Sequence, residues 1–442
     1  MIVLWTDALI FILCVIILAL AFYLRGKEHI KRPLQQIADN KIGMVSLAVL
    51  LFFVLIGLLD SVHYKPADNK SNEIISLLDA FAEPLREHGE KTYSAPFATT
   101  LYSKEMMTSA DGATQWGYPR LVFGGRHLDD TETQHIPDIL QKTAMGLAQG
   151  TGLSLFVALL LSGLLKHLLP KPTAKAVLAT VFIIITSAYT LCYLSGYYHV
   201  LGTDKVGEDV FYQAIKSIRT GLVIGTLTTL VMLPMAIIFG ILAGFFRGWV
   251  DDIIQYVYTT LNSIPGVLLI AASILMVQVY MANHEEDFTS VIVRADMRLL
   301  FLCLILGVTS WTGLCRLLRA ETLKLREMEY VQAAHALGVK QGTILIRHIL
   351  PNVMHIVLIS VVLDFSSLVL AEAVLSYINI GVDPTTYSWG NMINGARLEM
   401  AREPAVWWSL AAAFVFMFAL VLAANLFADT VQDAFDPRRS RG

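Results

Sequence analysis

Few side chains in this sequence have the types and spacing needed for catalysis or metal binding. His127 and His135 flank a short acidic run, which would permit a metal site, although a solvated acidic loop explains the pattern better. The four cysteines all lie in apolar runs, which favours small buried side chains over disulfides or zinc ligands. The sequence contains no G-x-x-x-x-G-K-[ST] run to cradle a nucleotide. We therefore expect no catalytic residue, metal ion or bound cofactor in this chain.

Two carboxylates stand out because they interrupt an apolar run. Asp364 and Glu372 lie within residues 353–380, and a carboxylate at the centre of a bilayer costs about 2.5–3.5 kcal/mol on insertion scales. Both should therefore face protein or water. Eight residues on an α-helix leave an angular offset of about 80°, so the two side chains share a broad face at best. A role in a transport pathway and a structural pairing with a neighbouring helix both remain open.

The composition is that of a membrane protein. Of the 442 residues, 55% are hydrophobic and only 16% are charged, whereas soluble domains carry about 25% charged residues. The mean hydropathy is +0.60. The net charge of -3 is close to neutral and argues against nucleic acid as a partner.

Apolar runs long enough to cross a bilayer recur along the whole chain. A bilayer core needs about 20 apolar residues per helix. The first run lacks a basic start and a small-residue cleavage site, so it resembles an anchor more than a signal peptide. We expect an all-α integral membrane protein with about nine transmembrane helices. The runs are 2–24, 43–60, 146–169, 176–197, 219–245, 264–282, 298–318, 353–380 and 406–427.

The distribution of lysine and arginine predicts the orientation of these helices. Basic clusters occur at 25–41, 166–175, 316–347 and 438–441, whereas the loop at 283–296 carries consecutive acidic residues. Short basic loops stay on the cytoplasmic side of a membrane. All four clusters lie there if the N-terminus is outside and the C-terminus is cytoplasmic, which an odd number of spans permits. The polar stretch 61–145 then lies outside as a small folded insert.

One cytoplasmic loop of this scheme, residues 329–351, has an unusual pattern. Four small or apolar residues recur at i, i+3, i+4 and i+7, and Gly338 follows where a left-handed helix cap is expected. A second apolar stretch is expected to stop at Pro351. The pattern favours a helix that a partner approaches closely, against an ordinary surface loop or a helix on the lipid surface, which would carry Trp or Phe. The four residues are Tyr330, Ala333, Ala334 and Leu337.

This loop resembles the cytoplasmic loop of ABC importer permeases, which reads Glu-Ala-Ala, three residues, Gly, nine residues, Ile-x-Leu-Pro. Gln332 replaces the glutamate and His348 the isoleucine, and Glu329, one turn earlier, could supply the missing charge. The form E-Y-V-x-A-A-x-A-L-G with H-I-L-P-N is similar to the dipeptide, oligopeptide and nickel branch. The residues that match the spacing are Ala333, Ala334, Gly338, Leu350 and Pro351.

Four more segments resemble that branch, in the order in which the branch has them. Residues 199–210 are similar to its external G-T-D-x-x-G-R-D-V segment, with Glu208 in place of the arginine. Residues 246–265 are similar to its first cytoplasmic loop. The other two, 375–393 and 425–438, are similar to its L-S-F-L-G-L-G…S-W-G segment and its C-terminal end. Together they mark a C-type permease. The matching residues of the external segment are Gly202, Thr203, Asp204, Gly207 and Asp209.

The resemblance covers about 190–442, with 35–60 as the first family helix, and it implies a type I ABC importer permease core with additions. We divide the chain into N-terminal spans at 1–60, the external insert at 61–145, two additional spans at 146–197, and the permease core at 198–442. The coupling loop of that core is about 320–351. The additions have no counterpart in the family pattern.

The resemblance also implies a function and partners. It indicates the permease subunit of an ATP-driven importer in the bacterial inner membrane, for di- or oligopeptides or alternatively nickel. Its partners would be a second homologous permease, an external solute-binding protein and two cytoplasmic ATPase subunits, which would carry the ATP and magnesium. A secondary transporter is the less favoured class, because we see no inverted repeat. A structural or signalling membrane protein would not need the Ala-Ala-x-x-x-Gly pattern.

Overall fold

The chain is mainly helical in the computed structural model, which describes residues 3–24, 28–65, 74–108, 114–284, 286 and 290–435. It forms two compact units, each assembled from separate stretches of sequence. Unit 1 contains residues 1–3, 35–221 and 386–423, and unit 2 contains residues 4–34, 222–385 and 424–442. Helices α8 and α17 each contribute to both units, so the units do not coincide with consecutive segments of the sequence.

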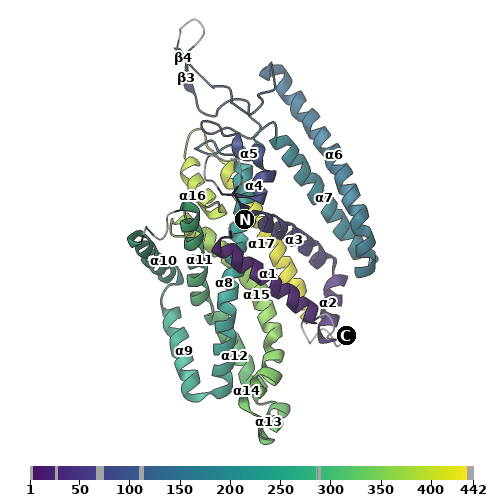
Figure 1. The fold of residues 1–442 in the computed structure, drawn as a ribbon, viewed down its shortest axis with the longest axis vertical. Coiled ribbons are helices and arrows are strands. Elements are labelled where there is room, and N and C mark those ends of the chain that lie inside the picture. Colours follow the sequence, from purple (N-terminus) through teal and green to yellow (C-terminus); the bar gives the residue numbers. More distant parts are fainter. Residues whose placement is uncertain are drawn as a thin grey trace. The chain divides into compact units, whose positions relative to one another are not determined.

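Seventeen α-helices and four short strands make up the described chain (Figure 1). The first seven helices are α1 Trp5–Leu24, α2 Glu28–Asp39, α3 Lys41–Asp60, α4 Leu77–Phe81, α5 Glu83–Glu87, α6 Thr131–Leu168 and α7 Lys171–Ser195. The next six are α8 Val210–Phe246, α9 Gly248–Ser263, α10 Gly266–Asn283, α11 Val291–Ser310, α12 Thr312–Arg326 and α13 Glu329–Ala336. The last four are α14 Gln341–Ile344, α15 Leu350–Tyr377, α16 Trp389–Glu399 and α17 Trp408–Phe435. The strands are β1 His63–Tyr64, β2 Ile75–Ser76, β3 Glu105–Thr108 and β4 Thr114–Gly117.

The expected all-α membrane fold is confirmed. Seven of the described helices are long and apolar enough to cross a membrane, and Trp5–Ala19 is a shorter apolar helix. The remaining expected run, 298–318, is divided between α11 and α12 at Trp311. Helix α11 also carries Arg294, Asp296 and Arg298 in its first half, so its apolar stretch is shorter than the run suggested.

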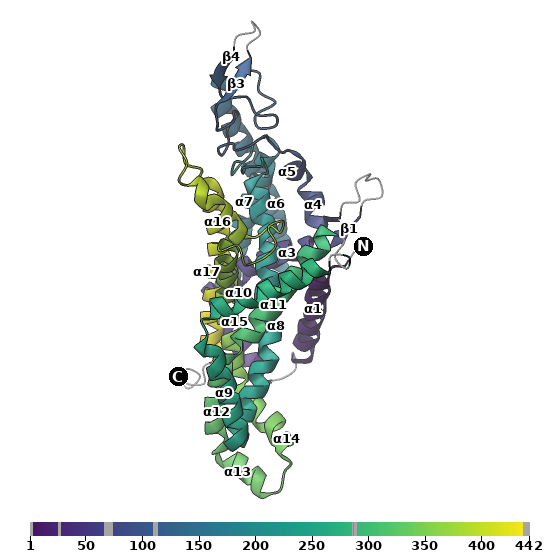
Figure 2. The ribbon, with the colours of Figure 1, turned by 90° about the vertical axis from the view of Figure 1, so that its left-hand side faces the viewer.

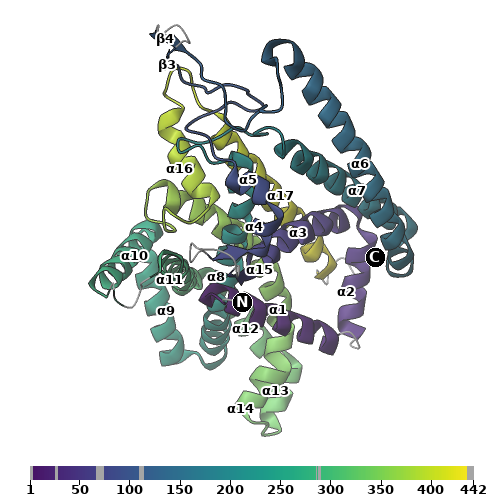
Figure 3. The same cartoon turned by 45° about the horizontal axis from the view of Figure 1, so that its top comes forward.

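In unit 1, α6 and α7 lie side by side along most of their length (Figures 1 and 3). Gly146 and Gly150 of α6 face α7, and a Cβ atom at Gly150 would lie 3.1 Å from the carbonyl oxygen of Thr186. Small residues at these positions let the two helix backbones approach closely. Helix α6 begins well before its apolar part, because Asp130 accepts a hydrogen bond from the backbone N–H of Glu132 and caps it.

The polar insert contains two short helices. Helices α4 and α5 are separate five-residue helices that meet at Ala82. Pro84 lies in the first turn of α5 and has no N–H to continue the bonding of α4, so the chain restarts there. A hairpin of β3 and β4 lies at one end of the insert (Figure 2), with Met106 opposite Trp116.

In unit 2, the N-terminal helix α1 packs against α11. Asp296 of α11 accepts hydrogen bonds from the backbone N–H groups of Trp5 (2.9 Å) and Thr6 (3.3 Å) and from the Thr6 hydroxyl. A carboxylate at a helix N-terminus satisfies N–H groups that have no partner within the helix. Leu9 and Ile10 then pack against the buried core of the unit, so the additional helix is part of unit 2.

Pro351 does not end the helical stretch before it, contrary to expectation. The chain is helical from α14 through α15, with one wide turn at Leu345–Ile349 in which the N–H of Leu350 donates to the carbonyl of Leu345. The wide turn contains one extra residue, so the carbonyl groups near Pro351 are bonded in a different pattern from that of a regular α-helix. The missing N–H of Pro351 is therefore tolerated. Helix α15 is therefore joined rigidly to the loop.

Candidate functional site

The loop between α12 and α15 lies at one end of unit 2 (Figures 1 and 2). It is far from the C-terminal end of α10 and the N-terminal end of α11. Its central element is the eight-residue helix α13. Val331 and Ala334 of this helix are buried in an apolar cluster that includes Leu318 of α12 and Ile344 of α14. This packing fixes the helix to the rest of the unit.

A neighbouring side of α13 is open. Tyr330, Ala333 and Leu337 are exposed, and Leu337 has an exposed fraction of 84%. The sequence pattern placed Ala334 on the same face as these three residues, but the structure places its side chain in the core. The exposed apolar face is therefore narrower than expected. Glu329 and Gln332 are also exposed beside it.

Gly338 has the conformation that the sequence predicted. Its φ angle is +75°, in the left-handed region, and it directly follows Leu337, the C-cap residue of α13. The N–H groups of Gly338 and Val339 bond to the carbonyls of His335 and Ala334 and complete the helix end. No atom lies within 4 Å of an added Cβ, so the backbone angle and not space requires glycine here.

Three contacts fasten α12 and the first residue after it to the corner between α8 and α9. The guanidinium of Arg319 holds the Asp251 carboxylate through two bonds of 2.6 and 2.7 Å. Arg326 donates to the carbonyl of Phe245 at 2.8 Å. An exposed ion pair of 2.6 Å joins Arg247 to Glu327. Arg319 therefore has a protein partner in the segment 246–265.

Replacing Arg319 with methionine should lower the stability of the purified chain by about 1–3 kcal/mol, because the mostly buried Asp251 carboxylate would lose its charged partner. Arg319→Lys should recover only part of this, since an ammonium cannot make the two parallel bonds. Thermal unfolding in detergent measures the effect. Arg316→Met is the matched control, since Arg316 is exposed on the same helix. Equal melting temperatures for Arg316→Met and Arg319→Met would contradict the assignment.

The two carboxylates of α15 are not brought together. Glu372 is buried and accepts a 2.7 Å hydrogen bond from Ser376, whose hydroxyl also lies 3.3 Å from the N–H of Val382. Asp364 is partly exposed, two turns away. Glu372 therefore helps to hold the turn that follows α15, which favours the structural interpretation for this residue.

The segment 202–209, which resembles an external segment of the family, forms a compact turn whose acidic residues organise the backbone. Asp204 accepts hydrogen bonds from the N–H groups of Val206 and Glu208, and Gly202 and Gly207 both have positive φ angles. Asp209 accepts from two N–H groups in the first turn of α8, at Phe211 and Tyr212, and so caps that helix. The five matching residues of the segment lie together in this turn. The hydroxyl of Thr203 bonds to the backbone N–H of Ser94 and the carbonyl of Thr92, and so joins the turn to the insert.

The two histidines near the acidic run are engaged separately. His127 bonds to Asp138 at 2.7 Å, whereas the ring of His135 bonds to the carbonyl of Phe97 at 2.7 Å. Over the described ranges, no three His, Cys, Asp or Glu side chains are grouped so that they could hold a metal ion. The geometry gives no support to a metal site at this loop.

Comparison with known proteins identifies the family. The sequence model described as "Binding-protein-dependent transport system inner membrane component" matches residues 236–441. This range includes α9 to α17 and therefore the whole loop around α13.

Three relatives illustrate the similarity. The glutathione transport system permease protein GsiD of Pectobacterium atrosepticum is 32% identical over 242 residues, which are 54% of this chain and 73% of the relative. The dipeptide transport system permease protein DppC of Lactococcus lactis is 29% identical, over 55% of this chain and 64% of its own length. The oligopeptide transport system permease protein OppC of Mycobacterium bovis is 28% identical over 288 residues, or 62% and 92% of the two chains. This multi-pass chain therefore belongs to the family of inner-membrane components of binding-protein-dependent transport systems.

Proposed function

We propose that this chain is one permease subunit of an ATP-driven importer of short peptides and forms half of the translocation pathway. The observation that carries the proposal is the similarity to permeases of glutathione, dipeptide and oligopeptide systems over more than half of the chain. A second homologous permease would form the other half. An external solute-binding protein would deliver the peptide.

The exposed face of α13 supports docking of a cytoplasmic ATPase. Tyr330, Ala333 and Leu337 present an apolar strip on a loop that is anchored by Val331 and Ala334. An exposed apolar surface rimmed by polar residues is typical of a protein contact. Two such ATPase subunits would bind ATP and magnesium, since the sequence of this chain lacks the glycine-rich run that cradles phosphates.

Movement of the ATPase would reach the membrane through rigid connections. Helix α12, which precedes α13, is tied to the corner of α8 and α9 through Arg319 and Arg326. After α13, the chain is helical without a break from α14 into α15. A displacement of α13 would therefore move several helices together as one body. The pathway would open alternately to either side of the membrane.

The proposed orientation places the N-terminus outside and the C-terminus in the cytoplasm. It rests on the four basic clusters of the sequence. The insert would then lie on the external side of the inner membrane, where a solute-binding protein approaches. The loop around α13 would face the ATPases.

Reconstituted uptake tests the proposal. The chain is assembled with its neighbouring permease and ATPase subunits in proteoliposomes, with its solute-binding protein outside, and uptake of a labelled dipeptide is measured. We expect uptake when ATP is supplied inside the proteoliposomes, where the ATPase subunits lie. We expect no uptake when a proton or sodium gradient is the only energy source. Uptake driven by a gradient without ATP would refute the importer class, whereas ATP-driven uptake of nickel but not peptide would refute the substrate.

A further inference from the structure

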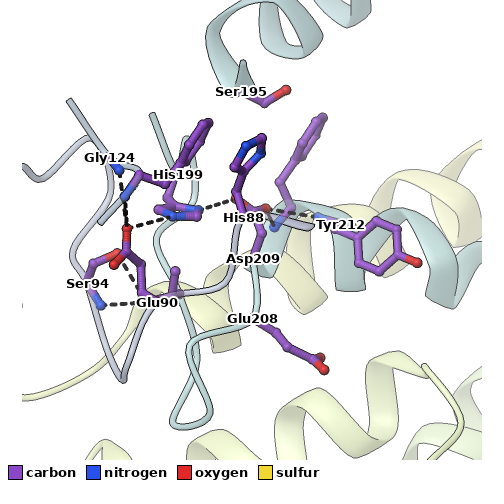
Figure 4. A network of polar contacts seen from close by, with 12 residues as sticks. His88, Glu90, Ser94, Gly124, Ser195, His199, Glu208, Asp209 and Tyr212 are labelled. Atoms are coloured by element: carbon purple, nitrogen blue, oxygen red, sulfur yellow. Dashed lines mark hydrogen bonds and ion pairs between the residues drawn. The ribbon is translucent and has the colours of Figure 1, made fainter. Parts of the chain in front are cut away.

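A buried histidine lies between two carboxylates where the insert meets the external segment (Figure 4). The Nδ1 atom of His199 is 2.7 Å from Asp209 Oδ2, and its Nε2 atom is 3.5 Å from Glu90 Oε1. The side chains of all three residues are at most 2% exposed. Nε2 makes no hydrogen bond in the part of the chain that the structure describes, so its contact with Glu90 is an ion pair without a formed hydrogen bond. Each ring nitrogen therefore faces a carboxylate oxygen.

Only the protonated ring fits this arrangement. A neutral imidazole carries one N–H and one lone pair, so one nitrogen would direct its lone pair at a carboxylate. The imidazolium has an N–H on each nitrogen and satisfies both neighbours. Burial increases the difference in energy between the neutral and the protonated ring, because no water molecule can hydrogen-bond to a mismatched ring nitrogen or carboxylate.

The two carboxylates belong to different parts of the chain and hold them together. Glu90, in the insert, also accepts hydrogen bonds from the backbone N–H groups of Val122, Phe123 and Gly124. Asp209 caps α8 in the permease core. The His199 cation therefore joins the loops of the insert to the start of the first core helix.

Backbone contacts run alongside the charged cluster. The N–H of Glu90 donates to the carbonyl of Gly207 at 2.9 Å, and the N–H of Thr203 donates to the carbonyl of Ser94 at 3.1 Å. A Cβ atom at Gly207 would lie 1.8 Å from the carbonyl oxygen of Glu90, so the glycine allows the close approach. The insert and the external segment form one paired structure here.

We propose that protonated His199 is a lock that keeps the insert docked on the external segment 202–209, and that loss of this proton releases the insert. The titratable groups that face the ring are Glu90 and Asp209. His88 stacks on Phe123, which itself contacts the His199 ring. Glu208 points away, toward Gln213 (Figure 4).

The titration of the cluster gives the direction of the effect. Burial alone would lower the pKa of His199, but the hydrogen bonds and charges of Asp209 and Glu90 outweigh it and raise the pKa from 6.5 to about 9. A raised histidine pKa stabilises the folded form fully below the unfolded value, and this stability is lost as the pH rises through about 9. The lock is therefore closed at neutral pH and opens in alkali.

Hydrogen–deuterium exchange of the full chain in lipid nanodiscs, followed by mass spectrometry from pH 7 to 10.5, tests the lock. Protection factors, which divide out the intrinsic exchange rate, are compared for peptides that contain residues 88–95 and 199–210. We expect protection to fall on the order of 50–100-fold, mostly between pH 7 and 9, and the pH dependence should fit a titration midpoint of His199 near pH 9. Protection that stays constant over this range would overturn the proposal.

Variants separate the lock from general stability of the insert. Glu90→Gln keeps a hydrogen-bond acceptor but removes one charge, so the midpoint should move down by about one pH unit or more. Asp209→Asn should do the same, since asparagine still caps a helix. The matched control is Glu105→Gln, whose partner Lys91 is exposed on the same insert. An unchanged midpoint in whichever of Glu90→Gln and Asp209→Asn folds would overturn the proposal.

Discussion

Ala333→Glu should reduce ATP-driven uptake by more than about tenfold while leaving the protein folded in the membrane. Ala333 is exposed on α13, between Tyr330 and Leu337, so a longer side chain there meets no atom of this chain's core. A charged glutamate in the centre of an apolar protein contact removes binding energy on the scale of a hot spot, about 2 kcal/mol or more. Co-purification of the ATPase with the variant and uptake in proteoliposomes measure the two consequences.

The matched control is His335→Glu on the same helix. Residues two apart on an α-helix point about 200° from each other, so position 335 lies on the other flank of α13 although it is exposed too. This variant introduces the same residue and should retain ATPase association and uptake. Equal losses in both variants would indicate a general effect of charge on the loop and contradict docking on the Tyr330–Ala333–Leu337 face.

Ala334→Glu is a poorer test than the sequence pattern suggests. Ala334 is 8% exposed and packs with Val331 in the core of unit 2. A glutamate there would bury an unpaired charge and displace α13 itself. Loss of transport in that variant would therefore report misfolding of the loop as much as loss of a partner.

Lys216→Met should destabilise unit 1 by about 3–5 kcal/mol, because it removes a cation that contacts two buried carboxylates. The ammonium of Lys216 lies 2.7 Å from Asp60 at the end of α3 and 2.8 Å from Asp79 in the insert. Both carboxylate side chains are less than a tenth exposed. Thermal unfolding of the full chain in detergent, with trypsin sensitivity of the insert, measures the loss.

A second-site change tests whether the carboxylates are the cause. In the Lys216→Met background, Asp60→Asn removes one of the two unpaired charges, so it should restore part of the lost stability, although it destabilises the wild type. Lys91→Met is the control, since it breaks an exposed pair with Glu105 and should change stability by less than about 1 kcal/mol. Simple additivity of Lys216→Met and Asp60→Asn would contradict the cluster.

The same cluster predicts an acid-dependent loss of stability. Burial alone raises the pKa of Asp79, but the charge and hydrogen bond of Lys216, with hydrogen bonds from Ser76 and Tyr212, lower it overall. A lowered carboxylate pKa contributes stability above the unfolded value, and this contribution is lost as the pH falls through the folded value. Wild-type protein should therefore lose insert stability in acid, with a weaker dependence in Lys216→Met.

Local patterns in the sequence predicted those features that depend on nearby residues. The long apolar runs predicted α3 and α10 to within two residues at either end, because a helix in a bilayer satisfies its own backbone hydrogen bonds. Gly338 was predicted correctly for a similar reason, since a helix end with a positive φ angle strongly favours glycine.

Contacts between distant residues were beyond these patterns. His199 directly precedes a recognisable motif, but nothing near it in the sequence indicates Glu90 as its partner. The continuation of the helix through Pro351 depends on the wide turn at Leu345–Ile349. Ala334 is buried while Ala333 stays exposed, because α12 and α14 pack against the side of α13 that carries Ala334.

The sequence by itself determined a multi-pass helical protein with a glycine-capped helix in the loop 329–351, because hydropathy and helix capping act over a few neighbouring residues. Only the tertiary structure decided which face of α13 stays open and how the insert is attached. Ionic clusters such as Glu90–His199–Asp209 and Asp60–Lys216–Asp79 form only when burial removes water from groups far apart in the chain.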